Sequence, residues 1–489
     1  MMMRSDIRHA ARAVAVAALL AGCAVGPDYH RPAADIPPAW QPEAPWHQAV
    51  PSDTVLKGNW WELFQDPALS PLVEQALASN QNLRIAAARL EQARDQLNIV
   101  RSASFPAVEL SSSALRSRSS ANRPLAAYSV PNQSTVQNNF QIGPSVSYEL
   151  DLFGRVRREV EGARATAQQA EADFENTRLM LMAALVTDYF SLRESDAEID
   201  VVRRSLDLQH DALTFVTSRH DLGFATGLEL AQQQALLDAS ATQLELLQNQ
   251  RAQFEHAIAT LTGTPAPAFA LAPVTAAPPL PLLPVGLPSD LLQRRPDVAS
   301  AERAMAAANA RIGVARAAYF PSIELAPGLG VPSVGWQSNA LASLFTAPSR
   351  LWSIGLSASQ TLFDAGKTRA NVRFADADYT AAVAAYRQTV LSAMEEVENG
   401  ITGLSSLERA EVQANSSVRS ASRAFDIASD RYQGGVATFL DVITAQQTLL
   451  ANQREAVQIQ GQQFATAVFL IKALGGGWSQ PARQSSLRD

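Results

Sequence analysis

The sequence has few of the residues that build disulfides and metal centres. One cysteine among 489 residues excludes a disulfide framework and a thiolate metal site. The six histidines are scattered between His9 and His256 and show no metal-ligand spacing. A balance of 40 basic against 47 acidic residues gives a net charge of −7, which does not favour binding to nucleic acid. Past the N-terminus no apolar run reaches about 18 residues, so the sequence offers no transmembrane helix.

Signatures of catalysis are also missing from the sequence. Residues 363–368 (FDAGKT) superficially resemble a phosphate-binding loop, but Thr361 stands where that pattern requires glycine. The position of this stretch between a strand pattern and a helix pattern favours a simple strand-to-helix joint. No Gly-x-Ser-x-Gly nucleophile motif occurs. We therefore do not expect an enzyme.

The N-terminus has the features of an export signal. A basic start is followed by an apolar stretch that is too short to span a bilayer and fits a secretory signal. Leu-Ala-Gly-Cys at 20–23 resembles the bacterial lipobox, in which the cysteine becomes the lipidated first residue of the mature chain. We expect a signal peptide over residues 1–22, a covalent lipid on Cys23, and no other cofactor or metal. Ala24, rather than Asp, follows the cysteine, and by analogy with bacterial lipoproteins this favours the outer membrane.

The body of the chain contains two copies of one pattern. Residues 105–110 (FPAVEL) match 320–325 (FPSIEL), and matches of this kind continue along both halves. The sequence therefore indicates a duplication. We divide the mature chain into five parts. An N-terminal segment (23–66) precedes the first repeat (67–263), a Pro-rich connector (264–288) leads to the second repeat (289–475), and a tail (476–489) follows.

Each repeat predicts the same order of elements: helix, strand, strand, long helix, helix. Alternation with period two marks the strands, and stretches without proline predict the helices. At 1.5 Å per residue the long helices would extend about 100 Å. The predicted first helices are 67–104 and 289–319, the strands lie near 107–115, 140–152, 321–331 and 351–362, and the long helices are 155–220 and 368–432. The return helices carry apolar residues at intervals of seven, typical of coiled coils, at Leu230, Leu237, Leu244, Ile443, Leu450, Val457, Phe464 and Ile471.

The strand patterns fit two kinds of protein. A half-buried sheet in a soluble domain alternates in this way, and so does a membrane β-barrel. The second face contains many small Ser and Gly residues, whereas the outer face of a soluble domain would usually carry more Lys and Glu, and this favours the barrel. Four strands per chain fall short of the eight or so that a bacterial barrel needs, and open sheet edges are not tolerated in lipid. Several copies must therefore share one barrel. Three copies supply about twelve strands, and the strand count alone also allows a dimer with about eight.

Four motifs resemble the TolC-like outer-membrane factors, in particular their lipoprotein branch: CAVGPDY at 23–29, LDLFGR at 150–155, LQRRPD at 292–297 and KALG at 472–475. The resemblance spans nearly the whole mature chain. It implies a mostly α protein with membrane β structure, in which a homotrimer builds a β-barrel of about twelve strands in the outer membrane. This barrel would be continuous with a periplasmic α-helical coiled-coil barrel. The N-terminal segment, the connector and the tail would form an equatorial belt.

The resemblance also implies a function and partners. Such trimers are the exit ducts of multidrug efflux pumps, which export drugs or other small toxic molecules. Their partners would be a periplasmic adaptor (membrane fusion) protein, an inner-membrane transporter of the resistance-nodulation-division (RND) class and the outer-membrane lipid. An exit duct for type I protein secretion and a passive porin are the alternatives.

The family positions that matter for gating fall at the turns between the long and return helices. Leu440 and Asp441 match the periplasmic constriction, where a three-fold axis would turn them into an apolar ring and a carboxylate ring that restrict passage. An acidic residue in the first turn of a helix also complements the helix dipole and needs no further role. The family position matching Thr444 is often acidic, so the resemblance implies a single acidic ring here.

Tyr432 and Glu229 match positions that hydrogen-bond between inner and outer hairpins and hold the entrance shut. The arginine that often assists corresponds to Ala437, which implies a weaker latch in this chain. We expect the adaptor to dock at the tip turns and release these contacts. The tip-turn residues are Gly223, Thr226, Gly435 and Thr438.

Overall fold

The computed structural model describes residues 24–31, 59–119, 135–275, 278–281, 295–335 and 344–476. These residues divide into two compact units. The strand unit takes in the described residues within 1–32, 91–168 and 302–384, and the hairpin unit takes in the others. The expected signal peptide, the expected lipid attachment residue Cys23 and the tail beyond residue 476 lie outside the described residues, as does most of the N-terminal segment.

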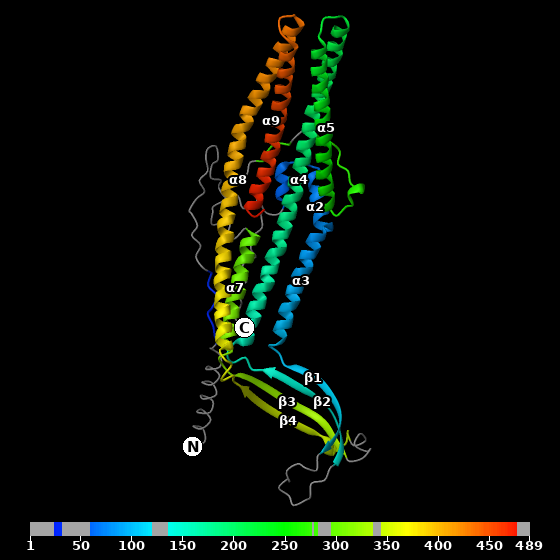
Figure 1. The fold of residues 1–489 in the computed structure, drawn as a ribbon. Coiled ribbons are helices and arrows are strands. Elements are labelled where there is room, and N and C mark those ends of the chain that lie inside the picture. Colours follow the sequence, from blue (N-terminus) through cyan, green and yellow to red (C-terminus); the bar gives the residue numbers. More distant parts are fainter. Residues whose placement is uncertain are drawn as a thin grey trace, which may run out of the picture. The chain divides into compact units, whose positions relative to one another are not determined.

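The strand unit contains one antiparallel sheet with the strand order β1-β2-β3-β4 (Figure 1). Each strand overlaps the stretch predicted for it. Because β2 comes from the first repeat and β3 from the second, their pairing, for example Tyr148 with Leu325, joins the two halves of the chain. The strands are β1 (Ala107–Ser119), β2 (Thr135–Glu149), β3 (Ser322–Gly335) and β4 (Leu351–Ser359).

The outer strands of this sheet are uncovered. Within the described residues, β1 and β4 each pair with one strand only. Every residue of β4 is exposed, and Trp352, Ile354 and Leu356 on one face are 74%, 68% and 65% exposed. A row of large apolar side chains open to this extent indicates a surface that meets another apolar phase or another copy.

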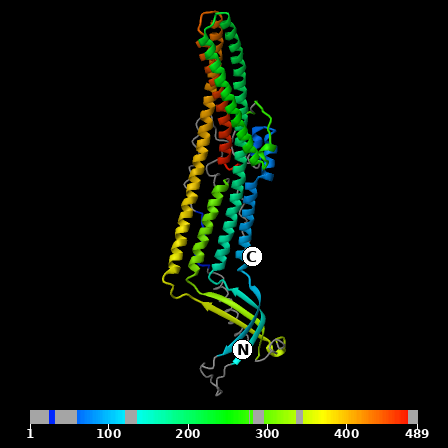
Figure 2. The same ribbon diagram turned by 45° about the vertical axis from the view of Figure 1, so that its right-hand side comes forward.

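After the strands the helices follow the same order in both halves, a long helix and then a return helix, and the mostly helical fold class is confirmed. The long helices α4 and α8 have 67 residues each, and the return helices α5 and α9 have 35 residues each. Figure 2 shows the two resulting antiparallel hairpins. Among the described helices, none is both long and apolar enough to cross a membrane. The helices are α2 (Leu69–Ser79), α3 (Gln81–Ser102), α4 (Arg155–Asp221), α5 (Gly227–Leu261), α7 (Pro296–Ala317), α8 (Lys367–Gln433) and α9 (Phe439–Ala473), with short 3₁₀ turns η1 (Trp60–Phe64), η2 (Ala266–Ala268) and η5 (Ala347–Ser349).

The single helix predicted over 67–104 is wrong, because Asn80 divides it into α2 and α3. The Asn80 backbone is extended, with φ −65° and ψ 129°. Its Oδ1 accepts the N–H of Leu83 at 3.0 Å, which caps α3, and its Nδ2 donates to the carbonyl of Leu261 at 2.9 Å. The Asn80 side chain therefore caps the N–H groups at the start of α3, and this stabilises a helix break although the neighbouring residues favour a continuous helix.

Capping aspartates start both long helices directly after the strands. Asp151 accepts the N–H groups of Val156 at 3.1 Å and Arg157 at 2.8 Å, which ends β2 earlier than predicted. Asp364 likewise accepts the N–H of Thr368 at 2.8 Å. The stretch FDAGKT is thus a capped strand-to-helix joint, as its position suggested.

The predicted interval of seven holds in part on α9, whereas the seam along α5 is shifted. On α9, Ile443, Phe464 and Ile471 are buried, and the predicted Leu450 and Val457 are half-buried. On α5 the predicted leucines are only half-buried. The buried positions at an interval of seven are instead Gln233, Ser240 and Leu247. Gln233 tolerates burial because its Nε2 donates to the Gln209 carbonyl of α4 at 2.8 Å.

An aromatic cluster forms the core of the hairpin unit. The Phe190 ring of α4 stacks on Phe464 of α9 with centroids 4.5 Å apart. Phe64 of η1 packs on Phe190 at 4.8 Å, and Trp60 meets Phe64 at 6.5 Å. Phe64 also lies 6.2 Å from Phe464, so it packs η1 against both hairpins, and each aromatic side chain buries a large apolar area.

Replacing Asn80 with Ala should destabilise the protein by about 1 kcal/mol, because the α3 cap and the bond to Leu261 are both lost. Thermal unfolding of the purified protein measures this loss. Asn82→Ala, at an exposed α3 position two residues further on, is the matched control and should leave the unfolding midpoint unchanged. Equal midpoints for the two variants would contradict the capping role of Asn80.

Candidate functional site

The hairpin tips are built by the same local structure in both repeats. At the first tip, Gly223 has φ +81° and permits the turn between α4 and α5, and Thr226 caps α5. The N–H of Thr226 donates to Glu229 Oε2 at 2.7 Å, while the N–H of Glu229 donates to Thr226 Oγ1 at 3.3 Å. This reciprocal pair is a capping box.

The second tip repeats the arrangement with shorter side chains. Gly435 has φ +75°, and Thr438 donates from its N–H at 3.0 Å and from its Oγ1 at 2.8 Å to Asp441 Oδ2. These hydrogen bonds, first from the Thr438 side chain and then from its backbone, lower the pKa of Asp441. Asp441 is therefore a charged, exposed carboxylate, as a carboxylate ring requires. The adjacent Leu440 side chain is exposed as well.

Tyr432 lies in the apolar cluster that joins the two tips. It is 7% exposed and packs with residues of both hairpins, including Val216 of α4 and Leu236 of α5. Its hydroxyl has no hydrogen-bond partner within the described residues, and Glu229 is occupied in its capping box. Burial raises the pKa of Tyr432, and the negative charge of Glu229 adds to this effect. Tyr432 and Glu229 are thus close enough to interact electrostatically, but no hydrogen bond joins them in the described structure of one chain.

Arg219 is a further bridging residue at the tips. Its guanidinium lies 5.0 Å from the centroid of the Tyr432 ring and 5.8 Å from that of Phe215. Its Nη2 donates to the carbonyl of Phe224 in the first tip turn at 3.5 Å. Arg219 therefore connects the first tip to a ring on the second hairpin by a cation–π contact. The internal repeat aligns Arg219 with Arg431 of the second half, and this alignment does not predict the ring contacts of Arg219.

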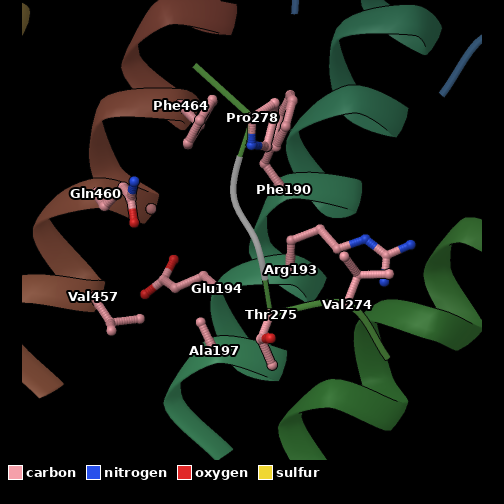
Figure 3. Close-up of a pocket in the computed structure, with 11 residues that line it drawn as sticks. Phe190, Arg193, Glu194, Ala197, Val274, Thr275, Pro278, Val457, Gln460 and Phe464 are labelled. Carbon is pink, nitrogen blue, oxygen red and sulfur yellow. The ribbon is translucent and has the colours of Figure 1, made fainter. Parts of the chain in front are cut away.

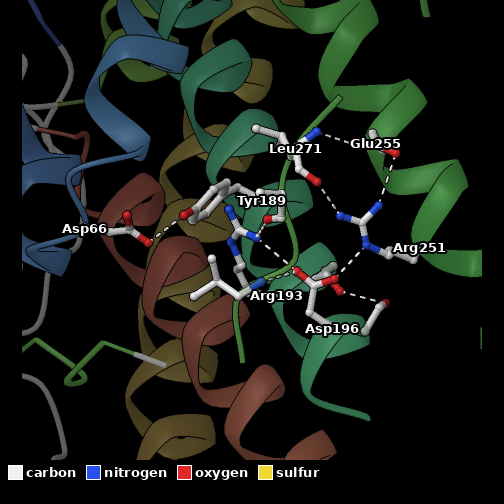
Figure 4. Close-up of polar contacts among 11 residues, drawn as sticks. Asp66, Tyr189, Arg193, Asp196, Arg251, Glu255 and Leu271 are labelled. Atoms are coloured by element: carbon white, nitrogen blue, oxygen red, sulfur yellow. Dashed lines mark hydrogen bonds and ion pairs between the residues drawn. The ribbon is translucent and has the colours of Figure 1, made fainter. Parts of the chain in front are cut away.

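A buried ionic cluster ties the connector to the first hairpin (Figure 4). The Asp196 side chain of α4 is 1% exposed and accepts from Arg193 at 2.9 Å, from Arg251 of α5 at 2.6 Å and from the Val274 N–H at 3.1 Å. Arg251 also donates to the Leu271 carbonyl at 2.6 Å. Since every charge has a partner, burial is tolerated. The sequence does not predict this cluster, and its role is to hold connector residues in place.

A second acidic residue of α4, Glu194, faces a small cavity beside α9 (Figure 3). As the described residues line it, the cavity of about 20 Å³ has room for one water and is too small for an organic ligand. Glu194 points towards Gln460, and a Cβ on Gly461 would come within 2.1 Å of its Oε2, so glycine makes the space for the carboxylate. Within the described residues Glu194 has no hydrogen-bond partner.

Burial raises the pKa of Glu194 to about 7, and the nearby charge of Glu198 adds to the shift. Glu198 itself accepts from Arg454 of α9 at 2.7 Å and from Gln458 at 3.2 Å, which leaves Glu194 without a cation. Arg193 points away from Glu194 in Figure 3 and pairs with Asp196. The folded protein therefore holds a proton on Glu194 at pH values where an unfolded chain would release it.

Glu194→Gln should flatten the pH dependence of stability between about pH 4.5 and pH 7. The raised pKa means that the folded state binds more protons in this window, so the wild-type protein loses stability as pH rises through it. Thermal unfolding at pH 5 and pH 8 should show a wild-type decrease that is larger than that of Glu194→Gln by about 1–2 °C. Glu245→Gln, at an exposed α5 position, should behave as wild type. Parallel pH profiles for all three proteins would disprove the role of Glu194.

Comparisons with known proteins agree with one another. The sequence model of the family described as "Outer membrane efflux protein" matches residues 72–264 and 287–476. The toluene efflux pump outer membrane protein TtgC of Pseudomonas putida is 32% identical over 473 residues, covering 96% of this chain and 95% of the relative. The outer-membrane channel OprN is similar in structure, with a TM-score of 0.84, 32% identity and coverage of 93% and 100% of the two chains. The open state of the Neisseria gonorrhoeae outer membrane channel MtrE has a TM-score of 0.78 at 28% identity, covering 93% and 98%.

Proposed function

Because the chain belongs to the outer membrane efflux protein family, we propose that it is the outer-membrane exit duct of a tripartite efflux pump. It exports drugs or other small toxic molecules and works with a periplasmic adaptor and an inner-membrane RND transporter. The observation that carries this proposal is full-length similarity, in sequence to a toluene efflux pump protein and in structure to an outer-membrane channel. The activity is conduction through a duct, without a catalytic step.

The sheet supports a trimer as the working form. Within the described residues, β1 and β4 each have one free edge, and the large apolar side chains of β4 are exposed. Edge-to-edge joining of three copies closes a barrel of about twelve strands and satisfies both edges. The exposed apolar row then faces lipid, and the helical hairpins of the three copies form the periplasmic coiled-coil barrel.

The strand unit also supports the lipid anchor on Cys23. Ala24, the residue after it, contacts Gly154 between the end of β2 and the start of α4. A lipid on Cys23 would therefore be attached one residue before the contact of Ala24 with the joint between β2 and α4. In a membrane barrel this joint lies at the periplasmic surface of the outer membrane, which is where an acyl chain can enter the bilayer.

The hairpin tips carry the gate. Leu440 and Asp441 form the constriction, and the Tyr432 hydroxyl and Glu229 form the latch once neighbouring copies are in place. Exposed apolar side chains surround the tip turns and give the adaptor a surface to dock on. They are Leu222, Phe224, Leu228 and Val436.

The latch and the constriction together should keep the resting conductance low. The double variant Tyr432→Phe with Asp441→Ala should raise the closed-state conductance in planar bilayers about tenfold, because it removes the latch hydroxyl and the acidic ring. Loss of the carboxylates should also reduce the preference for cations. Tyr379→Phe, on α8 but in the strand unit, is the matched control and should conduct as wild type does. An unchanged closed-state conductance in the double variant would disprove the gate assignment.

Complementation tests the function itself. A strain lacking this gene should accumulate a fluorescent pump substrate and become sensitive to toxic organic compounds, and the wild-type gene should reverse both effects. A passive porin would instead increase uptake when the gene is restored.

A further inference from the structure

Residues 24–31 of the strand unit lie on the helices with their backbone in direct contact. Gly26 has φ +113°, and a Cβ on it would come within 2.5 Å of the Gly313 Cα in α7. A Cβ on Gly313 would in turn come within 2.7 Å of the Arg158 Cγ. These short distances require glycine at positions 26 and 313, since real Cβ atoms do not approach other heavy atoms this closely.

Directional contacts fix the same segment at both ends. The N–H of Val25 donates to the Phe153 carbonyl at 3.0 Å, at the joint between β2 and α4. Tyr29 donates from its hydroxyl to Glu302 of α7 at 2.9 Å. Between these ends, Asn309 of α7 donates from Nδ2 to the Pro27 carbonyl at 2.9 Å.

Arg158 of α4 completes the contact. Its side chain is 6% exposed and pairs with Asp28 at 2.8 Å and with Glu161 at 2.7 Å. It also donates to the Gly26 carbonyl at 3.4 Å. A nearly buried arginine with one partner inside the segment and one in its own helix holds the segment against α4, because removing either partner would leave a buried charge under-compensated.

We propose that residues 24–31 form an anchor seat, which fixes the lipid of Cys23 at the strand-to-helix joint, and that Gly26 and Gly313 are its positioning residues. The proposal rests on the proposed lipidation of Cys23. Ala24 lies against Gly154, and consecutive Cα atoms are about 3.8 Å apart, so the seat begins one residue after the proposed point of lipid attachment. The seat also links α4 of the first repeat to α7 of the second.

Gly313→Ala tests the seat without weakening the helix around it. Alanine is the better helix former, so α7 itself should gain stability, whereas the new Cβ collides with Arg158 and displaces Gly26. In the purified lipidated protein, hydrogen exchange of the amides in residues 24–31 should become at least about tenfold faster than in wild type. Gly162→Ala is the matched control: its Cβ would meet Ala310 of α7 at an ordinary 3.5 Å, and exchange should stay slow.

A spin label on His30→Cys gives a second measurement. Cys23 is the sole natural cysteine, so in the lipidated protein the introduced thiol is the only free one. The label should be immobilised in the wild-type background and in Gly162→Ala and should become mobile in Gly313→Ala. Slow exchange together with an immobile label in Gly313→Ala would overturn the proposal.

The role of the lipid is tested separately. In the full chain exported through a secretory signal that is not lipidated, with Cys23→Ser, exchange in residues 24–31 should stay slow, because protein contacts hold the seat. Fast exchange in that variant would overturn the seat. Labelling of the wild-type chain with radioactive palmitate, lost in Cys23→Ser, tests lipidation itself, so failure of the anchor and failure of the seat give different results.

Discussion

Backbone hydrogen bonds at the edges of the four-stranded sheet constrain the rest of the molecule. Within the described residues, β1 and β4 each have one side without a strand partner. In hydrocarbon an unpaired N–H or C=O costs several kcal/mol, so a single copy cannot leave these edges open. Copies must join edge to edge, and the helices that follow the strands are then brought together with those of the other copies. A duct through the assembly follows from how the sheet closes.

Polar clusters hold the irregular segments to the helical framework. Asp196 with its two arginines ties the connector to α4 and α5, and Tyr189 donates to Asp66 at 2.6 Å beside η1. Such contacts fix segments that have no periodic pattern of their own, because each buried charge specifies its partner. Glu194 differs from these acids: within the described residues no cation pairs with it, and burial raises its pKa to about 7.

Periodic features could be predicted from the sequence, and contacts between distant residues could not. Alternation located the four strands, and the absence of proline located both long helices. The break at Asn80 was missed because an asparagine inside a helical pattern reveals its capping role only through its hydrogen bonds. The seam of α5 was misplaced because Gln233 and Ser240 are polar and were not counted as buried. The approach of Gly26 to Gly313 leaves no local signal at either position.

The two tips share a backbone but differ in side chains: Arg219 stacks on Tyr432, and the longer Glu229 stands where the second tip has Asp441. Around a three-fold axis the tips would form a ring of six turns in which two kinds alternate. A protein that recognises only the turn geometry would encounter pseudo-six-fold symmetry and six nearly equal positions. A protein that recognises the side chains of one tip would encounter three equal positions. The internal duplication therefore allows either six or three copies of a partner to bind the same ring.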